Sequence, residues 1–180
     1  MKREKKMILV AHCLLNVNAK VIGIANEAGG SSLIGKLVEK GYGIIQLPCI
    51  EMAMYGSQRW GVVYEQCDFL SYRNKCKELL NPIVEQVVDY SNHGYEIRAV
   101  IGADYSPTCG VNYTSKGKWS GELNEVNNYQ EKIDSVEIKE GNGIMIEELS
   151  LLLRKHSLDV PFYGIEETDM SSYLSILQMM

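Results

Sequence analysis

The stretch Met7-Ile-Leu-Val-Ala11 decides the fold class, because it is a short, unbroken apolar run that leads directly into His12 and Cys13. A strand that is covered on both faces of a parallel sheet has this composition. Three later stretches are similarly apolar, and we expect each to form a strand: Gly43–Leu47, Ile97–Gly102 and Val160–Ile165. The sequence therefore predicts a mostly parallel sheet of about four or five strands.

Helical patterns alternate with these strands. Apolar residues recur at helical spacing from Leu33 to Val38, where Ser31 or Ser32 is the expected cap and Gly41 the expected end. Further helices are expected over residues 69–91, Ile144–Leu153 and Ser171–Leu177. This alternation predicts an α/β three-layer sandwich with a Rossmann-like sheet and right-handed crossovers.

Two segments break the regular pattern. Pro82 lies inside residues 69–91, so this stretch is either one kinked helix or two helices in succession. Residues 112–139 are polar and have few apolar anchors, which indicates an exposed excursion, either a hairpin or a mobile lid. Neither segment indicates a domain boundary, and we expect residues 1–180 to form a single domain.

Charge and composition limit the function classes. The chain has 180 residues, 46% of them hydrophobic and 23% charged, with a net charge of -5. This balance gives no reason to expect a nucleic acid or a membrane as partner. Basic residues precede the first apolar run as in a signal peptide, but no cleavage site follows, and we expect a cytoplasmic protein.

Three of the predicted strands end in a cysteine-containing loop. The first leads into Cys13, the second into Cys49, and the third into Cys109. Because the carboxyl ends of parallel strands share one edge of the sheet, the three thiols can meet there despite their separation in sequence. The sequence therefore predicts a reactive or metal-binding site at this edge.

The alternative is that the cysteines only fill the core, since cysteine is among the most buried residue types. We interpret Cys67 and Cys76 in that way. Cys13, Cys49 and Cys109 are different, because three thiolates at close range repel one another and require a nearby cation. Soft sulfur ligands prefer zinc, copper(I) or an iron–sulfur cluster. Structural zinc usually has four ligands, often in close pairs that are missing here, so a [4Fe–4S] cluster on three cysteines, with one open iron, fits better.

Polar and aromatic residues near these loops are candidates for substrate contact. Glu51 follows Cys49 by two positions and could shuttle protons, or could be a loop acid or helix cap. Tyr55, Arg59 and Trp60 combine aromatic rings with a cation, which suits a planar heterocycle, although Trp60 could simply pack under its loop.

Asp104 and Ser106 come directly after the third strand. Asp104 could face the same crevice as a substrate-binding residue, or it could cap a turn.

Four motifs carry a resemblance to a known family. They are Ala11-His-Cys-Leu-Leu-Asn16, Pro48-Cys-Ile-Glu51, Ser106-Pro-Thr-Cys-Gly110, and the helix start at Gly141-Asn-Gly143. In this order they resemble the motifs of the thiouracil desulfidase family, a bacterial family that was long a domain of unknown function. Asn16 and Ile50 replace the usual Gly and Pro, so the chain is similar to a divergent subgroup.

The resemblance implies an oxygen-sensitive [4Fe–4S] cluster with Cys13, Cys49 and Cys109 as ligands. The open iron would take sulfur from a small thiolated compound, such as a thio-base or thioamide, and release it as sulfide, while water supplies oxygen to the carbon. Glu51 would be the acid/base, and Ser106 would position groups or relay protons. The substrate and the oligomeric state stay open.

Two other functions compete with this one. A non-catalytic cluster- or metal-binding module would hold the cluster without turnover. An enzyme with a cysteine nucleophile and no metal would need a Cys–His–Asp set, which the sequence does not clearly place.

Overall fold

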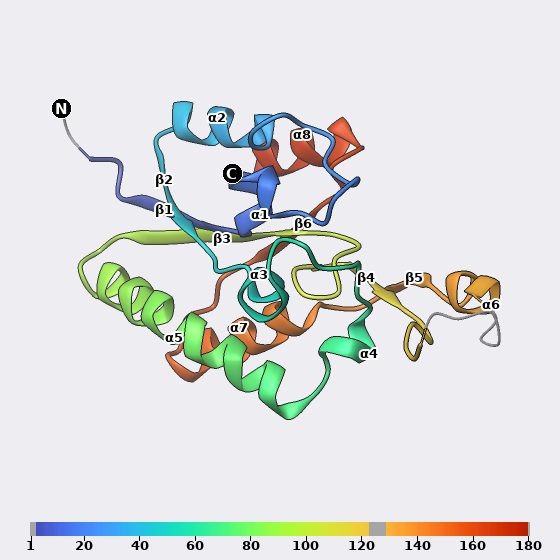
Figure 1. Ribbon diagram of the computed structural model, residues 1–180. Helices are drawn as coiled ribbons and strands as arrows, with labels where there is room; N and C mark the ends of the chain where they lie inside the picture. Colours follow the sequence, from blue (N-terminus) through green and yellow to red (C-terminus); the bar gives the residue numbers. More distant parts are fainter. Residues whose placement is uncertain (1–2, 123–128, 180) are drawn as a thin grey trace.

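The computed structural model describes residues 3–122 and 129–179, and it has four parallel strands at its centre (Figure 1). These are β1 (Lys6–Val10), β2 (Tyr42–Gln46), β3 (Glu96–Ala103) and β6 (Phe162–Ile165). The strand order is β2-β1-β3-β6, and every neighbouring pair is parallel. All four predicted strands are confirmed, each within two residues of its expected bounds.

Helices cover both faces of this sheet, which confirms the predicted three-layer sandwich (Figure 1). One layer holds α1 (His12–Leu15), α2 (Ser32–Glu39) and α8 (Met170–Met179). The other holds α3 (Ile50–Tyr55), α5 (Leu70–Asn92) and α7 (Ile144–Lys155), with α4 (Tyr64–Cys67) beside them. Central strands β1 and β3 are enclosed between the layers, so Ile8, Leu9, Val100 and Ile101 are fully buried.

The longer helices follow the sequence patterns closely. Ser31 caps α2 by accepting a hydrogen bond from the backbone N–H of Leu33, and Gly41 follows its end with a φ of +86° that glycine tolerates. Helix α5 runs through Pro82 without a break, so it is one helix and the two-helix alternative is wrong. No helix within the two described ranges is long and apolar enough for a membrane span.

The structure adds short helical turns that the sequence analysis missed. Helices α1, α3 and α4 and the 3-10 turn η1 (Val17–Ala19) each contain three to six residues. A segment of this length completes too few turns to show a hydrophobic period. Three of these turns, α1, η1 and α3, lie in the loops after β1 and β2, where they set the direction of the functional side chains.

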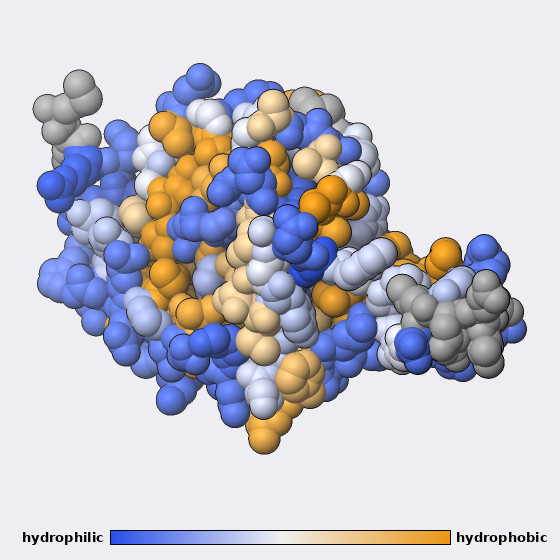
Figure 2. All heavy atoms as spheres, in the orientation of Figure 1, coloured by the Kyte–Doolittle hydropathy of each residue, from blue (hydrophilic) through white to orange (hydrophobic). Residues whose placement is uncertain are grey.

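Within the segment 112–139, the described residues 112–122 and 129–139 form an arm that stands away from the body (Figures 1 and 2). Strands β4 (Tyr113–Lys116) and β5 (Glu137–Glu140) pair antiparallel, and α6 (Tyr129–Asp134) lies between them in sequence. All four residues of β5 are exposed. The arm contains the expected hairpin, while its action as a lid stays a prediction.

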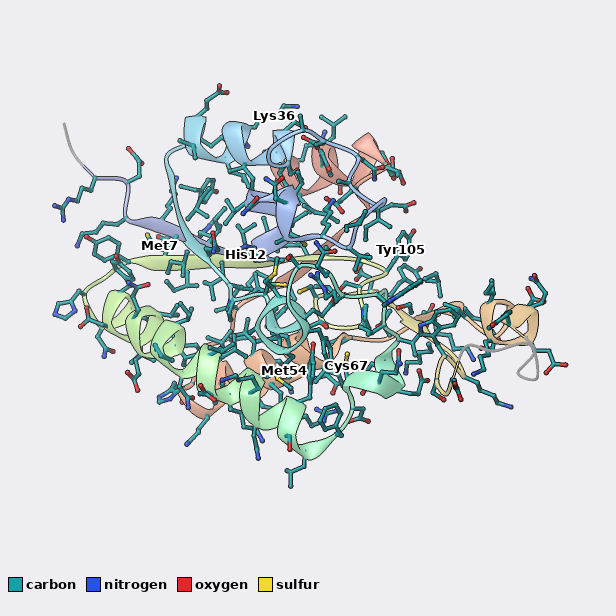
Figure 3. The ribbon with its side chains drawn as sticks, viewed as in Figure 1. Met7, His12, Lys36, Met54, Cys67 and Tyr105 are labelled. Atoms are coloured by element: carbon teal, nitrogen blue, oxygen red, sulfur yellow. The ribbon has the colours of Figure 1, made fainter. Side chains whose placement is uncertain are left out.

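Cys67 and Cys76 belong to the hydrophobic core, as expected of space-filling cysteines. Both are fully buried, Cys67 at the end of α4 and Cys76 on the inner face of α5. Figure 3 shows Cys67 beside α4. Burial raises the pKa of the Cys67 thiol to about 11 and that of Cys76 to about 12.

These two thiols should therefore resist alkylation in the folded protein. The thiolate is the nucleophile, and with these pKa values roughly one thiol in a thousand or fewer is ionised at pH 8. Iodoacetamide followed by mass spectrometry should leave both cysteines unlabelled in the native state, and label both in urea. Rapid native labelling of either residue would contradict its place in the core.

Candidate functional site

A cavity of about 340 Å³ lies at the carboxyl edge of the sheet. Its walls bring together the three predicted ligand cysteines and four of the other predicted site residues: Cys13, Cys49, Cys109, Glu51, Arg59, Asp104 and Ser106. They come from the loops after β1, β2 and β3. This is the edge at which parallel α/β sheets bind ligands.

Cys13 enters the cavity from α1. The chain turns into this helix directly after β1, where the backbone N–H of Ala11 still bonds to the carbonyl of Ile101 at 2.9 Å. Burial raises the pKa of the Cys13 thiol to about 12. The neighbouring residue His12 does not line the cavity, because its Nδ1 lies 2.7 Å from Nε2 of Gln46, among exposed groups.

Cys49 is the N-cap of α3. Its Sγ accepts a hydrogen bond from the backbone N–H of Met52 at 3.4 Å, as a capping oxygen would in other helices. This places Glu51 in the first turn of the same helix. Burial raises the pKa of the Cys49 thiol, while the bond from Met52 opposes that rise.

Cys109 lies in a tight loop that folds back onto the end of β3. Ser106 Oγ accepts hydrogen bonds from the backbone N–H groups of Thr108 at 3.2 Å and Cys109 at 3.0 Å. The carbonyl of Cys109 in turn accepts from the backbone N–H of Ala103 at 3.1 Å. Burial raises the pKa of the Cys109 thiol well above its ordinary value, and Cys13 raises it further.

Paired glycines in the sheet make room for this loop. Gly102 of β3 and Gly164 of β6 are neighbours across the two strands. A Cβ on Gly102 would come within 2.3 Å of the Cys109 carbonyl oxygen, and one on Gly164 within 2.2 Å of the Asp104 carboxylate. The loop therefore packs directly on the sheet backbone.

Glu51 is held from both sides in the cavity wall. Its Oε2 pairs with Nε of Arg59 at 3.2 Å, and its Oε1 accepts a hydrogen bond from Oγ1 of Thr108 at 2.9 Å. Tyr72 lies behind Thr108, with 3.0 Å between the two hydroxyl oxygens. Since Thr108 donates to Glu51, Tyr72 donates to Thr108, and the chain of hydrogen bonds ends on the carboxylate.

Arg59 also donates hydrogen bonds to two backbone carbonyls, in addition to its ion pair with Glu51. Its Nη2 donates to the Ala19 carbonyl at 2.7 Å and its Nη1 to the Gly56 carbonyl at 3.2 Å. The guanidinium therefore joins the loops after β1 and β2 while its side chain lines the cavity.

Asp104 both lines the cavity and caps a turn, so the two alternatives for this residue are compatible. Its Oδ1 accepts the backbone N–H groups of Val111 and Asn112, each at 2.8 Å, and its Oδ2 accepts from the side chain of Asn112. The next residue, Tyr105, has a φ of +73°, which is uncommon for a residue other than glycine. Figure 3 shows Tyr105 beside the carboxyl end of β3, at the cavity.

Tyr55 and Trp60 are not brought to the thiols. Tyr55 stacks on Tyr72 with 6.1 Å between ring centroids and is not among the residues that line the cavity. Trp60 is 72% exposed and lies in a separate hollow with Trp119 and Lys132. Their proposed contact with substrate stays a prediction that this arrangement does not support.

The cavity wall contains a second ion pair, formed by two residues that were not among the predicted site residues. Lys20 Nζ lies 2.5 Å from Oε1 of Glu167. Glu167 follows β6, so the carboxyl end of the fourth parallel strand also contributes to the site. The rule applied to the first three strands would have pointed to this residue as well.

The thiols do not surround a single point. Within residues 3–122 and 129–179, no group of three or more Cys, His, Asp or Glu side chains is placed to hold a metal ion. A [4Fe–4S] cluster differs from a single ion, because each cysteine binds a separate iron atom at a different corner. One buried and two half-buried thiols around one cavity are compatible with this arrangement.

Comparison with known proteins identifies a relative. The chain is 36% identical over 110 residues to Uncharacterized protein MJ0003 of the archaeon Methanocaldococcus jannaschii, in a match that covers 61% of this chain and 70% of that protein. The chain belongs to the same family as this archaeal protein. No protein-family model matches the chain.

A solved structure has a similar fold. It is that of the [4Fe-4S]-dependent thiouracil desulfidase TudS, which is 17% identical and aligns over 97% of this chain and 99% of its own, with a TM-score of 0.50. At this identity the likeness shows the fold. The resemblance seen in the motifs is therefore supported at the level of the fold.

The close packing of the Cys109 loop on the backbone at Gly102 can be tested by Gly102→Ala. The added methyl would overlap the Cys109 carbonyl and should lower the free energy of unfolding by about 1–3 kcal/mol. Gly35→Ala in α2 is the matched control, since nothing lies within 4 Å of its added methyl and alanine favours a helix. Equal urea stabilities of the two variants would show that the loop is not seated on the backbone.

The hydrogen-bond chain to Glu51 can be tested by Thr108→Val. Valine keeps the shape but removes the hydroxyl that donates to the buried Glu51 carboxylate and accepts from Tyr72, which should cost about 1–3 kcal/mol of unfolding free energy in urea denaturation. Thr168→Val, at an exposed hydroxyl, should change stability by less than about 0.5 kcal/mol. Equal losses of unfolding free energy at the two sites would argue against the hydrogen-bond chain from Tyr72 through Thr108 to Glu51.

Proposed function

We propose that the protein is an iron–sulfur-dependent desulfidase that removes sulfur, as sulfide, from a small thiolated compound such as a thio-base or thioamide. The observation that carries this proposal is the convergence of Cys13, Cys49 and Cys109 on one cavity that also holds Glu51. The shared fold with a [4Fe-4S]-dependent desulfidase supports it.

The donor set suits a cluster. The buried Cys109 thiol and the half-buried thiols of Cys13 and Cys49 lie close enough for Cys13 and Cys49 each to raise the pKa of Cys109, so three thiolates would be unstable here without a cation. Cys13, Cys49 and Cys109 would bind three irons of a [4Fe–4S] cluster, and the fourth iron would supply an open Lewis-acid position for a thione sulfur. Soft sulfur ligands favour this cofactor over magnesium or calcium.

Ser106 is placed to stabilise the Cys109 thiolate. Its oxygen already accepts two backbone N–H groups, so its own hydroxyl proton is left to donate, and its hydrogen bond to Cys109 lowers the pKa of that thiol. We assign Ser106 a positioning role at this cysteine.

Glu51 is the acid/base in this proposal. Arg59 and the Thr108 hydroxyl fix the position of the Glu51 carboxylate in the cavity wall, where it would accept a proton from the water that attacks the substrate carbon. The apolar cavity wall, which includes Val21, Val62 and Ala103, keeps bulk water away from this step. A nucleic acid or membrane partner remains unexpected, and the cytoplasmic location stays a prediction.

The test is anaerobic cluster reconstitution followed by assays of iron, acid-labile sulfide and sulfide release. The protein should hold about four irons and four sulfides. Cys→Ser changes at 13, 49 or 109 should abolish both the cluster and sulfide release from thio-bases. Cys76→Ala, in the core, is the matched control and should retain both.

Glu51→Gln separates the rival functions. It should keep the iron but lose about 100-fold or more in sulfide release, as expected for a general acid/base. A stable cluster with no turnover in the unaltered protein would favour a non-catalytic cluster module. A colourless, iron-free protein with thiols intact would remove the proposed mechanism.

A further inference from the structure

The ion pair between Lys20 and Glu167 is largely buried in a wall of the cavity, as the pair between Arg59 and Glu51 is. Only 5% of the Lys20 side chain and 20% of the Glu167 side chain are exposed. Both residues line the cavity, Lys20 from the turn after η1 and Glu167 from the loop after β6. They therefore reach the same space from opposite ends of the chain.

Stability alone does not account for such a pair. Taking two charges out of water costs several kcal/mol, and well-packed apolar residues in their place are often equally stable or better. The scaffold already closes this region by other means, since Tyr173 donates to the Glu167 carbonyl at 3.4 Å and Arg59 donates to the Ala19 carbonyl. A pair kept at this cost in a ligand cavity points to a binding role.

The pair has hydrogen-bonding capacity left over. In the described part of the chain, Lys20 Nζ has one hydrogen-bond partner, which is Oε1 of Glu167, and Oε2 of Glu167 has none. Two N–H groups and one carboxylate oxygen are therefore available side by side. A ligand that meets them must accept a hydrogen bond and donate one from neighbouring atoms.

The pair stands on the Cys13 side of the cavity. Glu167 raises the pKa of Cys13 and Lys20 lowers it, so both charges lie near that thiol. The other ion pair, Glu51 with Arg59, affects Cys49 in the same opposing way. The thiols are thus flanked by two charge-balanced pairs, one that holds the acid/base and one with free capacity.

We propose that Lys20 and Glu167 are the specificity-determining pair of this cavity, and that they bind the cis-amide edge of a neutral, single-ring compound. Lys20 donates to the ring carbonyl or its sulfur counterpart, and Glu167 accepts from the adjacent ring N–H. This rests on the proposed function for the reaction itself, but binding at the pair does not require turnover.

Charge and size set the ligand class. The pair is neutral overall, so an anionic ligand would be repelled by Glu167 and a cationic one by Lys20. A cavity of about 340 Å³ lies at the small end of ligand pockets, which suits one ring without an attached sugar phosphate. Apolar side chains such as Val21 and Ile24 supply faces for the ring.

The experiment compares two ligands that differ by one group. The probes are 2-pyridone, which has the cis-amide edge, and N-methyl-2-pyridone, in which a methyl replaces the N–H. Affinities are measured by NMR titration of the reconstituted protein under anaerobic conditions. The unaltered protein should bind 2-pyridone at least 10-fold more tightly than its N-methyl form.

Lys20→Met and Glu167→Gln should each weaken 2-pyridone binding by about 10- to 100-fold, the range expected for hydrogen bonds to charged groups. Only Glu167 faces the group in which the probes differ, so Glu167→Gln should leave binding of N-methyl-2-pyridone as weak as in the unaltered protein, and the selectivity ratio should fall toward one. Lys20→Met should weaken both probes alike, because both carry the carbonyl. Lys36→Met, on the exposed face of α2, should leave both affinities unchanged.

A structural role would give a different pattern. If the pair only clamps the loops together, both variants should lose thermal stability, Glu167→Gln should bind the two probes with an unchanged ratio, and Lys20→Met should bind both as tightly as the unaltered protein does; either binding result overturns the proposal. Failure of the unaltered protein to discriminate between the probes would also overturn it. Sulfide release is scored separately, so loss of turnover with intact ligand discrimination would count against the proposed function and leave the pair's role standing.

Discussion

The common direction of the four strands is the constraint on which the rest of the structure depends. Because β1, β2, β3 and β6 are all parallel, their carboxyl ends lie at one edge, and each loop that follows can reach the same cavity. Residues as distant in sequence as Cys13 and Glu167 therefore become neighbours without any long connection. Reversing one strand would remove its loop from the site.

Burial is the second constraint, because it makes every charge at this edge costly. The cavity meets this cost by pairing: Glu51 with Arg59 and Lys20 with Glu167. Burial raises the pKa values of the Cys13, Cys49 and Cys109 thiols, and the nearby Glu51 carboxylate raises them further. A site with paired carboxylates and uncompensated thiols is suited to a cationic group that binds sulfur.

The sequence contained enough to predict the sheet and the three cysteine loops. Apolar runs mark buried strands, and the parallel arrangement then places the strand ends together, so Cys13, Cys49, Glu51 and Ser106 could be named in advance. The directions in which side chains point from the short helical turns could not be predicted from the sequence. Without α3 in view, Tyr55 and Trp60 seemed equivalent to Arg59, yet only the arginine lines the cavity.

Other parts of the site depend on contacts that have no local signal. The hydrogen bonds from Tyr72 through Thr108 to Glu51 join three segments that are far apart in sequence. Neither Tyr72 nor Thr108 lies in a sequence pattern that would predict this contact. Glu167 was different, since it follows a correctly predicted strand and needed only the same reasoning carried to the fourth strand end.

The paired glycines beneath the Cys109 loop have a consequence for how the fold can change over time. At Gly102 and Gly164 the loop rests on main chain, and main-chain positions shift much less than side chains when a core is repacked. Substitutions elsewhere in the core can accumulate without moving Cys109. The chemistry at this edge is thereby insulated from sequence drift in the helix layers, which allows distant relatives to differ at most positions and still share one architecture.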